Sequence, residues 1–166
     1  MMRPLAVAAA SLALAACGLH PLYAGGSGSG AAGMLRSVQV SPIPGQSGWL
    51  VRNKLVDRLG ESGTASARYR LDVTLDDNIT TYGLRTDQAA TRERRTLRAR
   101  YQLVELGKGT VVLDATAGSD AGIDVVSSEY ATVAAEQTAL EDLTDKLADQ
   151  IVARLALYAS RTGAAK

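Results

Sequence analysis

Two segments of the chain alternate between apolar and polar residues so strictly that they predict β-strands with one buried face. The apolar positions are Tyr69, Leu71, Val73 and Leu75 in residues 68–78, and Leu97, Ala99, Tyr101 and Leu103 in residues 92–105. Successive side chains of a strand point to opposite faces, so each segment has one apolar and one polar face. Because the chain has no Phe and one Trp, Leu, Val, Ile, Ala and Tyr must form the core.

We expect these two strands to pair as an antiparallel hairpin in which partner numbers sum to about 170. The predicted partners are Leu71 with Ala99, Val73 with Leu97, Asp72 with Arg98, and Asp76 with Arg94. A tight turn at Gly107, Lys108 and Gly109 then predicts a third strand.

The remaining patterns predict one more strand and two helices. Residues 35–44 indicate a short strand that two prolines end. Residues 47–59 have the spacing of an amphipathic helix, with Ser47 as N-cap and Gly60 as the stop. From residue 128 to 158, leucines and an isoleucine recur at threes and fours, which predicts a long helix. We therefore expect an α+β fold, with two helices packed on one face of a four-stranded, mostly antiparallel sheet.

The N-terminus has the anatomy of a bacterial lipoprotein signal. Arg3 precedes an apolar run that ends in Leu-Ala-Ala-Cys17, the only cysteine. This resembles a lipobox, so we expect residues 1–16 to be removed and Cys17 to carry a diacylglycerol and an N-acyl chain. Residues 17–33, rich in Gly and Ser, form the predicted tether. A single domain over residues 34–160 and a flexible tail over 161–166 complete the predicted organisation.

Composition argues against an enzyme and against a nucleic-acid-binding protein. The only histidine, His20, falls in the predicted tether, which leaves no familiar triad or transition-metal site and implies no cofactor beyond the covalent lipid. Without Arg3 the chain has 17 basic and 17 acidic residues, so it lacks the basic surplus of a general nucleic-acid binder.

The polar face of residues 92–105 is rich in arginine and is the candidate binding surface. In the predicted register Arg70 and Arg100 meet without an acid between them, and Arg92 faces only Asn78. The predicted site residues are Arg92, Arg94, Arg98 and Arg100. Three uses stay open: cross-strand charge pairing alone, recognition of a phosphate or lipid A, or contact with a partner protein.

Four features of the sequence carry a family resemblance. These are the lipobox, the Gly-Leu-His-Pro-Leu-Tyr start of the mature chain, the element order, and the Glu129-Tyr-Ala opening of the last helix. In these features the chain resembles the LPS-assembly lipoprotein LptE family. Gly18 after the lipidated cysteine implies sorting to the outer membrane. The resemblance implies a lipoprotein that plugs the β-barrel translocon LptD, helps assemble it and aids lipopolysaccharide insertion into the outer leaflet. An auxiliary lipoprotein of an ABC-type lipid transporter, or a peptidoglycan-synthase activator, is the alternative.

Overall fold

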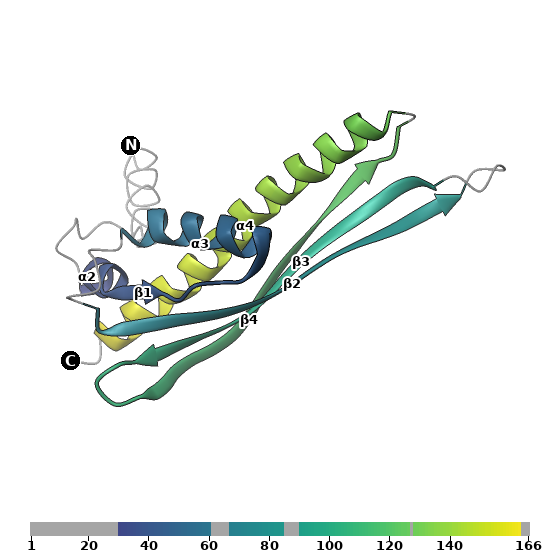
Figure 1. The fold of residues 1–166 in the computed structure, drawn as a ribbon. Coiled ribbons are helices and arrows are strands. Elements are labelled where there is room, and N and C mark those ends of the chain that lie inside the picture. The colour runs from purple at the N-terminus through teal and green to yellow at the C-terminus, as the bar shows by residue number, and fades with distance from the viewer. Residues whose placement is uncertain (1–29, 61–66, 85–89, 127, 164–166) are drawn as a thin grey trace, which may run out of the picture.

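The computed structural model describes residues 30–60, 67–84, 90–126 and 128–163 (Figure 1). The signal peptide, Cys17 and most of the predicted tether lie outside the described residues, so those sequence predictions stay predictions. Element labels below follow Figure 1.

Four strands form a single sheet in the order β1-β2-β3-β4. The strands are β1 (Val38–Val40), β2 (Tyr69–Leu84), β3 (Ala90–Glu105) and β4 (Thr110–Asp124). β1 runs parallel to β2, and the other two pairs are antiparallel. The predicted four-stranded, mostly antiparallel sheet is confirmed. The predicted turn also forms before β4, where Gly109 has a φ of 67° and its N–H donates to the carbonyl of Glu105 at 2.8 Å.

Three helices, one more than predicted, lie on the same side of the sheet (Figure 1). They are α2 (Gly30–Arg36), α3 (Gly45–Leu59) and α4 (Glu129–Gly163). α2 takes the last four residues of the predicted tether and the first two of the predicted strand, so that strand is confined to β1. The long C-terminal helix is confirmed, and it continues through the first three residues of the predicted tail.

The start of α3 differs from the prediction, whereas its end agrees. Pro44, in an extended conformation, is the N-cap residue, and no side chain caps the helix. Ser47 therefore lies inside the first turn, and its assignment as N-cap was wrong. Gly60 ends α3 in the left-handed conformation, and its N–H donates to the carbonyl of Val56 at 3.1 Å. Glycine adopts this conformation without the steric cost of a side chain.

The core lies between the helix-facing side of the sheet and the buried stripes of α3 and α4. Fully buried side chains come from the alternating positions of the strands and from the predicted helical spacing: Val38, Val40, Leu71, Leu97, Tyr101, Leu103, Val51, Leu55, Leu140, Leu143, Leu147, Ile151 and Leu155. Burying one such side chain contributes about 1.5–3 kcal/mol. The predicted inward faces of both strands are thus confirmed.

We expect Gly48→Ala to destabilise the domain by about 1–3 kcal/mol, because a Cβ there would lie 2.6 Å from the backbone oxygen of Ile43. Urea unfolding of the purified chain measures this change. Gly33→Ala is the matched control, since a Cβ at Gly33 meets nothing within 4 Å and alanine favours the helix. Equal stability of the two variants would show that the loop before α3 moves away from Gly48 at no cost.

Candidate functional site

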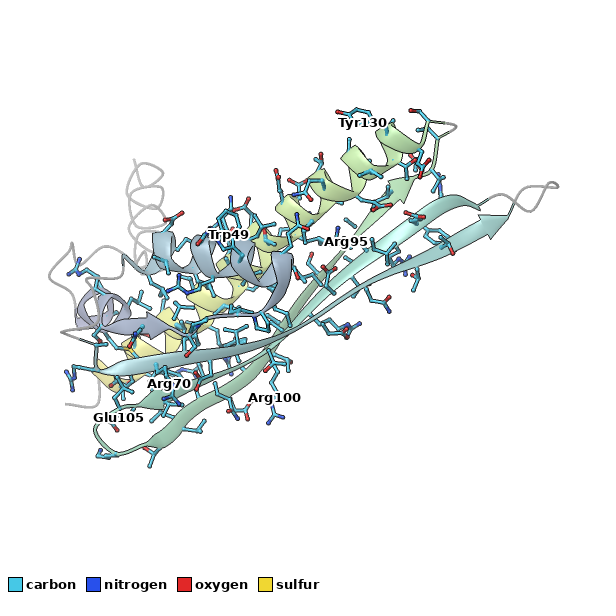
Figure 2. All side chains as sticks on the ribbon, in the orientation of Figure 1. Trp49, Arg70, Arg95, Arg100, Glu105 and Tyr130 are labelled. Atoms are coloured by element: carbon cyan, nitrogen blue, oxygen red, sulfur yellow. The ribbon has the colours of Figure 1, made fainter. Side chains whose placement is uncertain are left out.

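The face of the sheet that points away from the helices carries the predicted arginines. Arg92, Arg94, Arg98 and Arg100 are all exposed and share the outward parity of β3. Figure 2 shows Arg70 and Arg100 on this side and Arg95 on the side of the helices. We call the outward side chains of β2, β3 and β4 the outer face.

The register of β2 on β3 differs from the prediction by four residues. Tyr69 is opposite Glu105 and Val73 is opposite Tyr101, so partner numbers sum to 174. A shift by an even number leaves every side chain on its predicted face but changes its partner across the strands. All four predicted pairs were therefore wrong; Asp76, for example, lies opposite Arg98 rather than Arg94.

On the outer face, aspartates of β4 rather than of β2 pair with the arginines of β3. Arg92 contacts Asp124 at 3.2 Å, and Arg94 is 3.8 Å from Asp120. At the other end of the face Arg100 makes two hydrogen bonds to one carboxylate. Its Nη2 and Nε donate to the Asp114 oxygens at 2.8 and 3.2 Å.

The described outer face is balanced in charge, and the prediction that Arg70, Arg92 and Arg100 lack an acidic partner was wrong. Its five cations are Arg70, Arg92, Arg94, Arg98 and Arg100, and its five anions are Asp72, Asp76, Asp114, Asp120 and Asp124. Arg70 is paired with Asp72 at 3.0 Å. Among these ten side chains only Arg98 and Asp76 make no ion pair with a described residue, although their Cα atoms are register partners.

Arg98 lines an open hollow of about 650 Å³, whose lining also includes Gly118 and Asp120 of β4 and Gln150 of α4. Thr74, Asp76, Thr96, Arg100 and Thr116 also line it. Gly118 on β4 lets the stem of Arg98 lie flat, because a Cβ there would come within 3.3 Å of the Arg98 Cγ. The hollow thus presents the uncommitted guanidinium of Arg98 beside the hydroxyls of Thr74, Thr96 and Thr116 and the carboxylate of Asp76, which likewise makes no ion pair with a described residue. The guanidinium is suited to a phosphate or carboxylate oxygen.

Arg94 contacts the ring of Tyr82 in addition to its long ion pair with Asp120. Its guanidinium carbon lies 5.5 Å from the centre of the Tyr82 ring, within the range of a cation–π contact. The ring crosses the sheet toward β4, where the Tyr82 hydroxyl comes within 3.7 Å of a Cβ placed on Gly122.

We expect the carboxyl of Asp114 to titrate with a pKa of about 2, because hydrogen bonds from Arg100 and then Gln102 stabilise its charged form. Because the pKa of Asp114 is lower in the folded state, the charged carboxyl stabilises the fold at pH values above the ordinary pKa of 3.8. This stabilisation is lost as the pH falls toward 2. Carboxyl-carbon NMR titration measures the pKa directly. In Arg100→Gln it should rise toward 3.8, whereas Arg92→Gln should leave it unchanged; no rise in Arg100→Gln would contradict the pairing.

The helix-facing side of β3 carries polar residues that the sequence analysis missed. Arg95 donates to both oxygens of Asp77 at 2.9 and 2.7 Å and to the backbone oxygen of Glu136 on α4 at 3.1 Å. Asp77 therefore raises the pKa of this guanidinium. The alternation of β3 could have identified Arg95, since it places the odd-numbered residues of this strand on the side that faces the helices.

Burial, and then the neighbouring carboxyl of Glu136, raises the pKa of Glu93 on the same side of β3. A carboxyl with a raised folded-state pKa supports the fold below its ordinary value of 4.5 and costs stability as pH rises through the folded-state value. We therefore expect Glu93→Gln to stabilise the chain at pH 7 and to leave it nearly unchanged at pH 4. Urea midpoints at both pH values measure this, with Glu129→Gln as the exposed control; a loss of stability at pH 7 would contradict the assignment.

Within the described ranges, no group of three or more His, Cys, Asp or Glu side chains could hold a metal ion. No helix in that part of the chain is long and apolar enough to cross a membrane.

Comparison with known proteins places this fold among bacterial lipoproteins. A crystal structure of a protein from Caulobacter crescentus CB15, described as a lipoprotein, superposes with a TM-score of 0.64 at 24% identity, covering 79% of this chain and 96% of that one. Rare lipoprotein B from Shewanella oneidensis superposes with a TM-score of 0.59 at 11% identity, covering 75% and 96%. A minor lipoprotein from Acinetobacter baumannii gives 0.57 at 16%, covering 74% and 92%. No curated protein sequence matches the chain.

The sequence itself matches one family model, and the match spans most of the domain. The model is LptE, described as lipopolysaccharide-assembly, and it covers residues 35–155. This range runs from the end of α2 almost to the end of α4 and includes the whole sheet. The chain belongs to the LptE lipopolysaccharide-assembly family.

Proposed function

We propose that this protein is a non-enzymatic outer-membrane lipoprotein that plugs an LptD-like β-barrel, helps it assemble and aids lipopolysaccharide insertion into the outer leaflet. A lipidated Cys17 anchors it in the inner leaflet of the outer membrane, and residues 17–33 connect that anchor to the domain. The domain then lies on the periplasmic side or within the barrel. The family match supports the role in lipopolysaccharide assembly.

The observation that carries the proposal is the long, uncovered and charge-balanced outer face. The lumen of a large outer-membrane barrel is polar, so a protein that fills it needs a polar surface with local charges of both signs. Exposed pairs such as Arg92 with Asp124 contribute little to folding, so exchanging them for charges of a barrel wall costs little.

Arg98 is the preferred lipopolysaccharide contact among the four candidate arginines. Its guanidinium has no ion pair in the described part of the chain, and it faces an open hollow. The three others are engaged by Asp114, Asp120 and Asp124. A phosphate at Arg98 could then recruit Arg94, whose ion pair at 3.8 Å is the longest on the face.

Purification of the lipidated protein in mild detergent, followed by mass spectrometry, tests the partner. We expect a stoichiometric large β-barrel protein. An inner-membrane ATPase complex, or a cell-wall synthase, in its place would contradict the proposal and favour the alternative class of lipoprotein.

Substitution of the arginines tests the face. We expect Arg98→Gln to weaken binding of lipopolysaccharide micelles several-fold, and the Arg92, Arg94, Arg98 and Arg100 quadruple alanine variant to weaken it further with the fold retained. The control replaces Arg70 and Asp72 together with alanine, an outer-face ion pair that does not line the hollow, which preserves the charge balance and should have little effect. If the quadruple variant folds and binds lipopolysaccharide as the parent chain does, the outer face is not the lipopolysaccharide-binding surface.

A further inference from the structure

β4 forms one edge of the sheet, and a side chain bonds to its main chain there as a neighbouring strand would. The N–H of Gly118 donates to the Gln150 Oε1 at 3.3 Å, and the Gln150 Nε2 donates to the carbonyl of Gly118 at 3.3 Å. This reciprocal pair reproduces the two hydrogen bonds that one residue of an added antiparallel strand would exchange with Gly118. Gln150 is exposed on α4, so its amide can leave without disturbing the core.

The main-chain groups on either side of Gly118 face the same way. In an antiparallel ladder the N–H and C=O of alternate residues point to the same neighbour, so those of Thr116 and Asp120 also point away from β3. Among the described side chains, Gln150 alone hydrogen-bonds to this edge, and it does so only at Gly118.

A hollow of about 390 Å³ lies beside this edge, between β4 and α4. Ala115 and Ala117 leave the space open, and the buried Tyr101 forms part of its wall. Arg154 of α4 also lines it, and this exposed guanidinium makes no ion pair or hydrogen bond with any described residue. The edge therefore combines open main-chain groups with an unneutralised cation.

We propose that the β4 edge from Thr116 to Asp120 binds an extended acidic peptide segment of a partner protein, whose main chain replaces the Gln150 amide and whose carboxylate contacts Arg154. The outward N–H and C=O groups of alternate β4 residues favour a peptide over a phosphate, because a phosphate offers no hydrogen-bond donor to the carbonyls. The unpaired Arg154 selects an acidic side chain. Thr116, Gly118, Asp120 and Gln150 also line the hollow around Arg98, so the two sites adjoin. The proposal rests on the main-chain groups of the β4 edge and on Arg154, and it does not depend on lipopolysaccharide binding at Arg98.

NMR titration of the full lipidated chain in detergent tests the proposal. The probe is a capped heptapeptide of alternating valine and threonine with one central glutamate, and its control has lysine at that place. We expect saturable amide shifts at Thr116, Gly118 and Asp120. Binding should weaken about tenfold, or 1.4 kcal/mol, with the lysine peptide and in Arg154→Gln.

Further variants separate main-chain pairing from a charge effect. Gln150→Ala frees the edge of Gly118 and should tighten peptide binding, and N-methylation of alternate peptide amides should abolish it. Arg98→Gln, on the outer face, should bind the peptide as the parent chain does. Absence of saturable shifts, equal binding of the glutamate and lysine peptides, or the same shifts with inorganic phosphate would each overturn the proposal.

Discussion

We expect Leu147→Ala to destabilise the domain by about 2–5 kcal/mol, the range for removing a buried leucine from a core that cannot collapse around the cavity. Leu147 is completely buried, and it lies in the stripe of α4 that packs on the sheet. Urea unfolding followed by circular dichroism measures the loss as a lower midpoint with an unchanged slope.

Leu157→Ala is the matched control on the same helix. Leu157 is 40% exposed and lies outside the core, so its truncation should cost less than about 1 kcal/mol. Equal losses in the two variants would show that α4 packs on the sheet through a different stripe.

Arg95→Ala is the second large effect, with an expected loss of about 2–3 kcal/mol. The side chains of Arg95 and Asp77 are only 13% and 19% exposed, so removing the guanidinium leaves the carboxylate of Asp77 poorly solvated. It also removes the hydrogen bond to the backbone of Glu136, which ties β3 to α4. The expected loss lies below that of a fully buried pair because some solvent reaches both groups.

Arg92→Ala isolates this effect from the general loss of an arginine. Arg92 and Asp124 are 63% and 80% exposed, so breaking that pair should change the free energy of unfolding by less than about 0.5 kcal/mol. Arg95→Lys should recover part of the loss by restoring a cation near Asp77. A cost at Arg92 equal to that at Arg95 would contradict the different burial of the two pairs.

The sequence predicts which face each strand residue occupies far better than it predicts what that residue touches. Leu71, Leu97 and Tyr101 are buried as their parity predicts, because alternation depends only on the pleat of the strand. The partner of Asp76 depends on where the hairpin turns. The strands run past residues 78 and 92 to Leu84 and Ala90, and nothing in the alternation shows that extension.

The difference between the face that a residue occupies and the residue that it contacts also explains which features of the candidate site the sequence predicted. The exposed arginines of β3 follow from parity, but their pairing depends on the aspartates of β4. That register includes an irregularity between Leu103 and Val104, which no sequence pattern marks. Arg98 stands out as unpaired only once all three strands are in place.

The unpredicted helix α2 shows how tertiary packing overrides local propensity. Its Gly-Ala-Ala-Gly start has the composition of a linker, and glycine disfavours helix interiors. Leu35 is nevertheless buried in the core, and Met34 packs against it. The contact with the rest of the domain stabilises a turn that the sequence alone disfavours.

The equal numbers of arginines and aspartates on the outer face also bear on how fast a partner finds it. Alternating charges of opposite sign cancel at a distance, and screening at physiological ionic strength acts within about 8 Å. Such a face exerts almost no long-range attraction, so encounters with it proceed at the rate set by diffusion and orientation and depend little on salt. Recognition by this face therefore resides in the lifetime of the complex rather than in its rate of formation, which favours a partner already held nearby.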